Sequence, residues 1–334
     1  MRLLVTGGLG FIGSHTTVLL LQAGYEVVIL DNLSNSHLQV LNAIEQLCHQ
    51  RPQFIQGDVR DRDQLNALFT AFPCQAVLHF AGLKAVGESV QHPLRYYDNN
   101  VNGLISLLLA MEQAHVHQLV FSSSATVYGE PTILPLTESH PLSATNPYGQ
   151  TKLIGEHLLQ DWHRSQRHSA IACLRYFNPV SAHPSGLLGE NPQGKPNNLM
   201  PYIMQVASGQ RDTLHIFGND YPTPDGTGIR DYLHVMDLAA GHVAAVDYLL
   251  RHPYAFLQVN LGTGQGYSVL ELMHMVERVT GKPIPHEIVA RRPGDIASCY
   301  ADPTLAKQYL NWVAHHDLFT MCADAWRWTQ HHQP

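Results

Sequence analysis

The sequence has little charge and little cysteine. Charged residues make up 14% of the 334 residues against 45% hydrophobic ones, a balance typical of a soluble globular protein, and the net charge of −7 disfavours a nucleic-acid-binding surface. The five cysteines are odd in number and include no Cys-x-x-Cys pair. We therefore expect free thiols in a reducing cytoplasm rather than a disulfide framework.

Membrane segments and metal-binding motifs are also lacking. No apolar run is long enough to cross a bilayer, and the first residues already belong to a predicted strand, so we expect neither a membrane anchor nor a signal peptide. The 22 histidines include no His-Glu-x-x-His or similar ligand spacing, so no metal is predicted. The length allows two domains or one large one.

A glycine string lies close to the N-terminus, in TGGLGFIG at residues 6–13. It follows a short apolar run, 2–6, that is typical of a buried strand, and it precedes a helical pattern that ends near Gly24. In this context Gly7, Gly10 and Gly13, with Gly8 in an overlapping register, predict a dinucleotide site. One glycine makes the turn, one admits a pyrophosphate and one lets the helix pack on the strand.

The carboxylate expected of such a site is also present. A second predicted strand, 26–30, is followed by Asp31, at the position where an acid accepts hydrogen bonds from an adenosine ribose. An acid there favours a free 2′-hydroxyl, because a 2′-phosphate would meet like charge. The sequence therefore predicts NAD in preference to NADP.

Strands and helices alternate through the first half of the chain. Further strands are predicted at 53–56, 76–80, 118–122 and 170–175, with helices near 37–50, 61–72, 92–114 and 147–165. This rhythm predicts a doubly wound, mostly parallel sheet of the α/β class. After residue 178 the sequence becomes rich in Pro, Gly and Asn, which indicates a smaller, discontinuous α+β substrate domain over 179–334. A segment near 233–262 is expected to rejoin the first domain, 1–178.

Polar residues follow the predicted strands, where ligands bind in this architecture. Asp58 follows the third strand, although it is also a plausible N-cap for the next helix. Ser124 follows the fifth strand, and the helix after Pro147 carries Tyr148 and Lys152 four positions apart, on one face. A tyrosine needs a nearby cation to act as a base near neutral pH, so these three residues form a candidate catalytic triad.

Long strings of the sequence resemble the extended short-chain dehydrogenase/reductase family, and within it the branch that inverts C4 of UDP-hexoses. Besides the glycine string and the Tyr148 motif, the resemblance rests on DN (31–32), FAGLKAVGE (80–88), NNVNG (99–103), SSSATVYG (122–129), LRYFNPV (174–180), PNNLMPY (196–202), FGNDY (217–221), GIRDYLHV (228–235) and RRPGD (291–295). It covers nearly the whole chain.

This resemblance implies a reversible exchange of UDP-glucose and UDP-galactose through a 4-keto sugar, with Ser124, Tyr148 and Lys152 as catalytic residues beside tightly bound NAD. It implies that NAD contacts these three residues, the glycines and Phe11, Ile12, Asp31, Asn32, Asn35, Ser36, Asp58, Val59, Phe80, Lys84, Asn99 and Phe177. It further implies that the UDP-sugar contacts Ser124, Tyr148, Asn178, Asn198, Leu199, Phe217, Arg230, Arg292, Asp295 and Cys299.

Several alternatives accompany these expectations. Arg230 and Arg292 suit a diphosphate, although they could instead be salt-bridged surface residues. Cys299 stands where a bulky tyrosine in the family goes with exclusion of N-acetylated sugars, so its small size predicts acceptance of the UDP-N-acetylglucosamine and UDP-N-acetylgalactosamine pair. It could also be no more than a small buried residue.

The remaining alternatives concern function and assembly. A 4,6-dehydratase shares the scaffold but needs an added acid near Ser124, where Ala125 and Thr126 stand, and a non-enzymatic NAD sensor needs no such triad. The resemblance implies a homodimer through the helix at 104–111, an apolar run that could also be simple core, and the Tyr148 helix.

Overall fold

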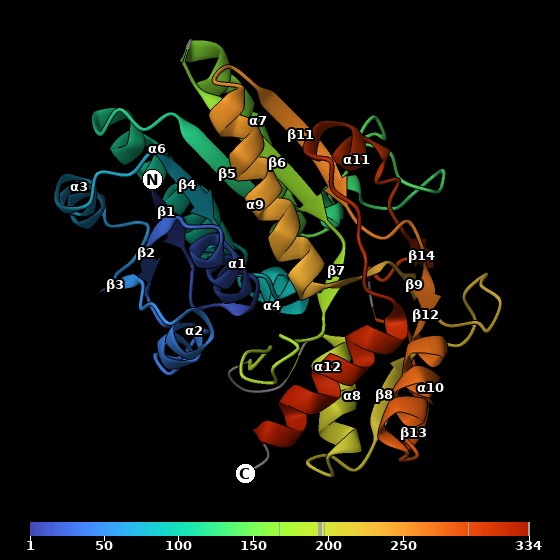
Figure 1. Cartoon of the computed structure of the whole chain (residues 1–334). Coiled ribbons are helices and arrows are strands. Elements are labelled where there is room, and N and C mark those ends of the chain that lie inside the picture. The colour runs from blue at the N-terminus through green and yellow to red at the C-terminus, as the bar shows by residue number, and fades with distance from the viewer. Residues whose placement is uncertain (167, 193–195, 197, 293, 333–334) are drawn as a thin grey trace.

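The computed structural model describes residues 1–166, 168–192, 196, 198–292 and 294–332. Seven parallel strands form its main sheet, in the order β11-β6-β5-β4-β1-β2-β3 (Figure 1). Their bounds are β1 Arg2–Thr6, β2 Glu26–Asp31, β3 Gln53–Gln56, β4 Ala76–His79, β5 Gln118–Ser124, β6 Ala170–Tyr176 and β11 Phe256–Leu261. Strand order reverses between β1 and β4, which confirms the predicted doubly wound fold.

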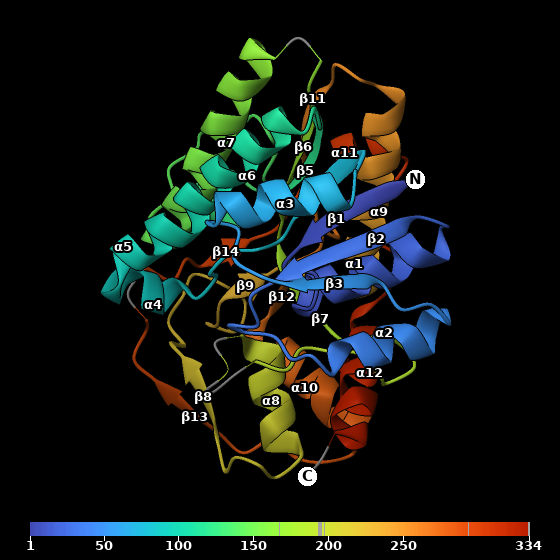
Figure 2. The ribbon, with the colours of Figure 1, turned by 90° about the vertical axis from the view of Figure 1, so that its left-hand side faces the viewer.

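Helices cover both faces of the sheet, because each buried strand points alternate side chains to opposite sides. One face carries α1 Phe11–Gln22, α2 Val40–Cys48, α9 Val235–Arg251 and α11 Thr304–Leu310. The other carries α3 Arg62–Ala71, α6 Gly103–Gln113 and α7 Pro147–Ser165, which lie together in Figure 2. On β1, Leu3 and Val5 enter the first layer and Leu4 the second.

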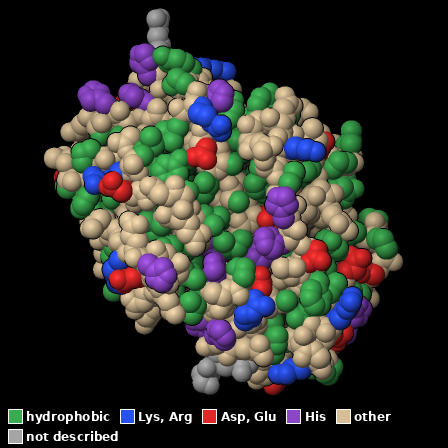
Figure 3. All heavy atoms as spheres, viewed as in Figure 1, with side chains coloured by type: hydrophobic (Ala, Val, Ile, Leu, Met, Phe, Trp, Pro, Cys, Tyr) green, Lys and Arg blue, Asp and Glu red, His purple; other side chains and the backbone are tan. Residues whose placement is uncertain are grey.

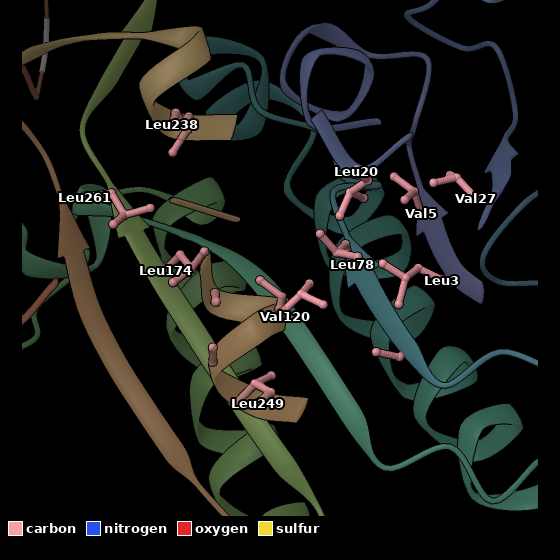
Figure 4. Packing of buried hydrophobic residues seen from close by; sticks show 14 of the residues in the cluster. Leu3, Val5, Leu20, Val27, Leu78, Val120, Leu174, Leu238, Leu249 and Leu261 are labelled. Atoms are coloured by element: carbon pink, nitrogen blue, oxygen red, sulfur yellow. The ribbon is translucent and has the colours of Figure 1, made fainter. Parts of the chain in front are cut away.

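The layer beneath α1 and α9 is a continuous apolar core. Figure 4 shows Leu20 of α1 near Val5 and Leu78, and Leu249 of α9 near Val120. Full burial of one such side chain stabilises the fold by about 1.5–3 kcal/mol. This core fixes the carboxyl ends of β1, β4 and β5 relative to one another, which is where the candidate site lies.

Beyond those strand ends the chain builds a second lobe with its own core, formed by residues such as Ile203, Leu272 and Met321. Its helices are α8 Leu199–Ala207, α10 Val269–Thr280 and α12 Leu318–His331. Its strands pair as β7 Asn178–Val180 with β10 Tyr232–His234, β8 Leu214–Phe217 with β13 His286–Val289, and β12 Tyr267–Ser268 with β9 Ile229–Arg230 and β14 Ser298–Cys299. Strand β11 joins the first sheet beside β6. The division of the chain at residue 178 stays a prediction.

The structure refines one local prediction and removes one alternative. The stretch 92–114 is helical, as predicted, but it is divided: after α4 Val86–Gln91 come α5 Pro93–Tyr96, a π-helical segment η1 Tyr97–Asn102, and then α6. Asp58 is not the N-cap of the helix that follows it, because Asp61 caps α3 by accepting a hydrogen bond from the Gln64 amide. A short 3-10 segment, η2 Ala125–Tyr128, follows β5.

Candidate active site

The glycine string forms a tight cradle between β1, β4 and α1. Gly7 has a positive φ of 68°, and a Cβ there would lie 2.7 Å from the Ala81 nitrogen. At Gly13 a Cβ would lie 2.3 Å from the Gly7 carbonyl oxygen, so only glycine lets α1 start this close to β1. Gly10 is the N-cap of α1 and has no capping side chain. The first amides of α1 therefore face the end of β1, in the arrangement that binds phosphate.

Two carboxylates flank this cradle at the ends of β2 and β3. Asp31 is buried and accepts hydrogen bonds from the Leu9 amide (3.0 Å), the Leu33 amide (2.9 Å) and the Ser36 hydroxyl (2.7 Å). Asp58 accepts from Asn32 at 3.1 Å and pairs with Arg60 at 2.8 Å. The Arg60 guanidinium holds the pKa of the Asp58 carboxyl well below its usual range.

The other residues predicted to contact NAD lie around the same strand ends. Phe80 packs against His242 with ring centroids 4.7 Å apart, and the Lys84 ammonium lies 5.9 Å from the Phe11 ring centroid. Asn99 donates to Asn100 in η1 at 2.9 Å. Of the remainder, Ile12 packs on the core below α1, the Val59 side chain lies against Gly103, Phe177 is buried after β6, and Asn35 lies in the loop after β2.

The structure brings Ser124, Tyr148 and Lys152 together at the end of β5. Their side chains are buried, with 7%, 7% and 6% exposure. The Lys152 ammonium lies 6.0 Å from the Tyr148 ring centroid and donates to the Ser122 carbonyl at 2.7 Å. Asn146 caps α7 by accepting from the Gly149 amide, and Pro147 occupies its first turn, so the helix begins just before Tyr148.

The protonation of this trio follows from its burial. Burial raises the pKa of the Tyr148 phenol, while the Ser124 hydroxyl opposes that rise. Burial lowers the pKa of Lys152 to about 8, so the side chain is still mostly cationic at pH 7. A phenolate at Tyr148 therefore depends on positive charge close by, which Lys152 supplies. The trio can accept a proton from a substrate hydroxyl and return it.

The residues predicted to hold a UDP-sugar come from the second lobe and the segments leading to it. The Arg292 guanidinium pairs with Asp295 at 2.9 Å and lies 4.7 Å from the Phe217 ring centroid. Arg230 donates to the Ile229 carbonyl at 2.8 Å, and β9 sets it beside Cys299 of β14 in register. Both arginines act on the buried Tyr232 phenol, where they oppose the burial that raises its pKa.

The remaining members of that set lie at the start of two elements. Asn178 begins β7, and its backbone N–H donates to the Asp231 carbonyl at 3.0 Å. Asn198 is the N-cap of α8, and Leu199 is its first residue. Asn197 and Pro293, which belong to two of the motif strings, lie outside the described residues. The alternative that Arg292 serves as one half of a surface ion pair stays open.

Sequence reasoning missed several residues that build the site. Asn100 is buried in η1, where its amide bonds the Leu83 backbone at 2.8 and 3.0 Å and the Thr151 hydroxyl at 2.9 Å, which ties the β4 loop to α7. Glu190 accepts from Lys84 at 2.8 Å and Asn198 at 2.7 Å, and so joins the two sets of predicted ligands. The contacts of Asn100 and Glu190 join segments far apart in the sequence, so no local pattern predicts them. Only the NNVNG motif, which contains Asn100, gave a signal.

Comparison with known proteins adds the family. Residues 4–325 match the family model described as GDP-mannose 4,6 dehydratase. UDP-glucose 4-epimerase of Bacillus subtilis is 56% identical over 328 residues, which cover 98% of this chain and 96% of that protein. The chain belongs to the UDP-glucose 4-epimerase family.

Solved structures of 4-epimerase family members share the whole architecture. The Stenotrophomonas maltophila enzyme, crystallised with NAD and formylated UDP-arabinopyranose, has a TM-score of 0.97 at 52% identity and covers 99% of this chain and 98% of its own. The Bifidobacterium longum enzyme, with NAD+ and UDP, has a TM-score of 0.97 at 48% identity and covers 99% of both chains.

Three further observations complete the description of this 4-epimerase family member. Within the described part of the chain, no helix is long and apolar enough to cross a membrane, and no group of three or more His, Cys, Asp or Glu could hold a metal ion. On the face seen in Figure 3, Lys and Arg are interspersed with Asp and Glu.

Proposed function

We propose that this chain catalyses the reversible C4 epimerisation of UDP-glucose and UDP-galactose with NAD as a resident cofactor. The observation that carries the proposal is the buried trio of Ser124, Tyr148 and Lys152 beside the glycine cradle of β1. Full-length relatives that are named as 4-epimerases support the same reaction.

NAD fits the residues present. A Cβ at Gly7 or Gly13 would clash with neighbouring backbone, and one at Gly10 would lie 3.2 Å from the Gly7 carbonyl oxygen, so glycines allow the tight turn that places the first amides of α1 where a pyrophosphate can bind. The Asp31 carboxylate at the end of β2 suits a ribose with a free 2′-hydroxyl. When bound, NAD supplies a reversible acceptor for the hydride of C4.

The chain's own residues then accept one proton from the substrate and return it. Tyr148 as phenolate accepts the proton of the sugar O4 hydroxyl as C4 is oxidised to a ketone, and the same phenol returns it when C4 is reduced from the opposite face. Lys152 stabilises the phenolate, and the Ser124 hydroxyl donates a hydrogen bond to the reacting oxygen. No proton or electron pair is consumed over a full cycle.

The UDP group serves as the fixed handle for a sugar that must turn over between the two transfers. We assign this role to Asn178, Asn198, Leu199, Phe217, Arg230, Arg292 and Asp295. The positive charges of Arg230 and Arg292 both lower the pKa of the Tyr232 phenol against the effect of its burial, and two cations acting on one region suit a diphosphate. Binding energy far from C4 thereby holds the ketone intermediate while its ring reorients.

We further propose that the sugar pocket admits a C2 acetamido group. Cys299 is small and buried, and burial raises the pKa of its thiol to about 12, so it is a neutral wall rather than a reactive thiolate. A tyrosine at this position would add an aromatic ring to the wall beside Arg230. The pair UDP-N-acetylglucosamine and UDP-N-acetylgalactosamine is therefore a second substrate pair.

The rival reaction is a 4,6-dehydration, which the description of the family model favours. Dehydration must expel a hydroxyl group and so needs an acid beside the ketone. The residues after Ser124 are Ala125 and Thr126, and the Thr126 hydroxyl donates to Ser124 at 3.0 Å. Because neither Ala125 nor Thr126 can act as that acid, epimerisation fits these residues better than dehydration. A non-enzymatic NAD sensor would not need the buried trio of Ser124, Tyr148 and Lys152.

We also propose that the chain forms a homodimer through α6 and α7. Ile105 and Leu109 lie one turn apart on α6 and are each 38% exposed, which leaves an apolar strip on a helix whose other apolar side chains are buried. Ile105→Glu should shift the mass measured by light scattering from dimer to monomer.

The five cysteines are free, which supports a reducing compartment such as the cytoplasm.

Product analysis tests the proposed reaction. Purified protein without added NAD is incubated with UDP-glucose, UDP-galactose and the two N-acetylated forms, and the products are separated by HPLC. We expect each sugar to give a mixture with its C4 epimer. A product that has lost water would support the dehydratase, and no product from any sugar would support the sensor.

A further inference from the structure

A buried ion pair lies directly beneath the candidate active site. Arg175 of β6 is 2% exposed and Glu156 of α7 is 1% exposed. Their contact is bidentate: Arg175 Nε lies 2.9 Å from Glu156 Oε1, and Arg175 Nη2 lies 2.6 Å from Glu156 Oε2. The proposed reaction uses neither residue, so the pair calls for another explanation.

The Glu156 carboxylate joins α7 to three strands. Besides Arg175 of β6, it accepts from the Ser123 hydroxyl of β5 at 2.5 Å and from the Gln258 amide of β11 at 2.9 Å. Helix α7 runs along β5 and β6 (Figure 1). It comes so close that a Cβ on Gly155 would lie 2.7 Å from the Phe121 ring. The two oxygens of this carboxylate thus accept hydrogen bonds from three different strands, and each oxygen accepts from Arg175 and from one further side chain.

The catalytic groups are the immediate neighbours of this network. Tyr148, Lys152 and Glu156 are spaced by four residues on α7, so they share one helix face. Ser124 follows Ser123, and η2 follows Ser124. Arg175 Nη1 donates to the Tyr128 hydroxyl at the end of η2 (3.2 Å), and that hydroxyl donates to Asn260 of β11 at 2.6 Å. The network therefore brackets Ser124 on both sides.

Stability alone does not account for the pair. Desolvation of two charges costs as much as their attraction returns, and apolar residues of similar volume often serve a core equally well. Apolar side chains make no directional bonds, whereas the two parallel hydrogen bonds of a guanidinium–carboxylate pair fix the distance and the angle between two elements. Catalytic groups need that kind of placement, since a misplacement of about 1 Å can reduce a rate about a hundredfold.

We propose that the Glu156–Arg175 pair is a positioning device that fixes α7 against the ends of β5 and β6, so that Tyr148 and Lys152 meet Ser124 in reactive geometry. The proposal rests on the proposed function, because it concerns the same trio. The pair acts through position, not through its charge: burial and Ser124 account for the pKa shift of Tyr148, and burial accounts for that of Lys152.

The test replaces both charges by apolar side chains of similar length, in Glu156→Met with Arg175→Met, which avoids a lone buried charge. We expect a folded protein with unchanged UDP affinity and unchanged KM, and a kcat reduced at least about tenfold. Arg175→Lys keeps the charge and loses the fork, so it should give a smaller loss in the same direction. If the double variant does not fold, Arg175→Lys carries the test alone.

A second measurement needs no turnover. Tyrosinate absorbance of the NAD-loaded protein, minus that of its Tyr148→Phe counterpart, reports the titration of Tyr148. If the loss of the pair increases the distance between the Tyr148 ring and the Lys152 ammonium from about 6 to about 8 Å, the pKa of Tyr148 should rise by about half a unit. Glu112→Gln is the matched control, because Glu112 holds the far end of α7 through Trp162 at 2.8 Å. It should lower the melting temperature and leave both readouts unchanged.

The outcomes separate the two proposals. A folded double variant, or a folded Arg175→Lys variant, with wild-type kcat and wild-type Tyr148 titration overturns the positioning role. Wild-type protein that turns over no UDP-hexose overturns the proposed function. In that case the Tyr148 titration still decides whether the pair positions the trio.

Discussion

The two sides of the proposed site are built differently. The proposed catalytic trio and Asp31 lie at the ends of long parallel strands or on a 19-residue helix, and all four are nearly inaccessible to water. On the sugar side, Phe217 is 37% exposed and the Arg292 side chain 52% exposed, on two- to four-residue strands and the loops between them. Proton transfer needs groups that are fixed in position, whereas the sugar side has only to hold the UDP group while the sugar turns. The predictions below are ordered by expected size and test this division.

Removal of the base should break the chemistry and spare the binding. Tyr148→Phe keeps the ring in its buried place and should reduce kcat at least about a hundredfold, because proton transfer in the transition state is lost. The Kd of UDP, measured by calorimetry, should stay within about twofold, since the proposed uridine contacts lie on the sugar side. Tyr25→Phe, the same change at a part-buried hydroxyl that bonds Asp247, is the control. Near-normal turnover by Tyr148→Phe would contradict its role.

Removal of the cation should move the pH profile rather than abolish activity. A charge about 6 Å away stabilises the phenolate by about 3 kcal/mol at an effective dielectric of about 20, or about two pKa units. Lys152→Met should therefore shift the rising limb of the kcat profile to higher pH, with a large loss at pH 7 that shrinks as the pH rises. A profile that keeps its midpoint would reject the electrostatic role.

A change in the pocket wall should alter selectivity and leave the chemistry. Cys299→Tyr should reduce kcat/KM for the N-acetylated pair at least about tenfold, by steric overlap, and should affect the UDP-glucose pair far less. Cys299→Ala keeps the space and should keep both pairs. Equal losses for the two pairs in the Tyr variant, or a wild type inactive on the N-acetylated pair, would show that Cys299 does not set the choice.

One cation on the sugar side should contribute to affinity alone. Arg292→Met removes a guanidinium that packs on Phe217 and should weaken UDP binding about tenfold, while kcat at saturating substrate changes little. If kcat falls as much as affinity does, Arg292 takes part in the chemistry and the division between the two sides is wrong.

The smallest effect concerns stability on the cofactor side. The Arg60 guanidinium depresses the pKa of Asp58, so its contribution is present above the unfolded pKa near about 4 and is lost as the pH falls below it. Because both side chains reach solvent, Asp58→Asn should cost less than about 1 kcal/mol at pH 7, and the difference should vanish in acid. Asp61→Asn, which keeps a capping oxygen, is the control for urea melts at both pH values.

The same division separates what the sequence predicts from what it does not. Tyr148, Lys152 and the glycine string could be predicted because helix spacing and a strand-turn-helix unit are local. The seven strands of the main sheet could be predicted because parallel strands are short apolar runs, whereas the short strands of the second lobe could not. The π-helical turn at 97–102 and the Glu156–Arg175 pair depend on contacts between distant segments, which no local pattern encodes. Arg230, Arg292 and Asp295 were proposed through resemblance, because short strands and loops have no periodicity.

The central claim is that a hydride leaves C4 and returns to the same carbon without exchange. UDP-glucose carrying deuterium at C4 is given to the purified protein without added NAD, and the UDP-galactose formed is examined by mass spectrometry and proton NMR. The account predicts that C4 of the product keeps essentially all the deuterium. Loss of the label to solvent, or its appearance at another carbon of a dehydrated product, would contradict it.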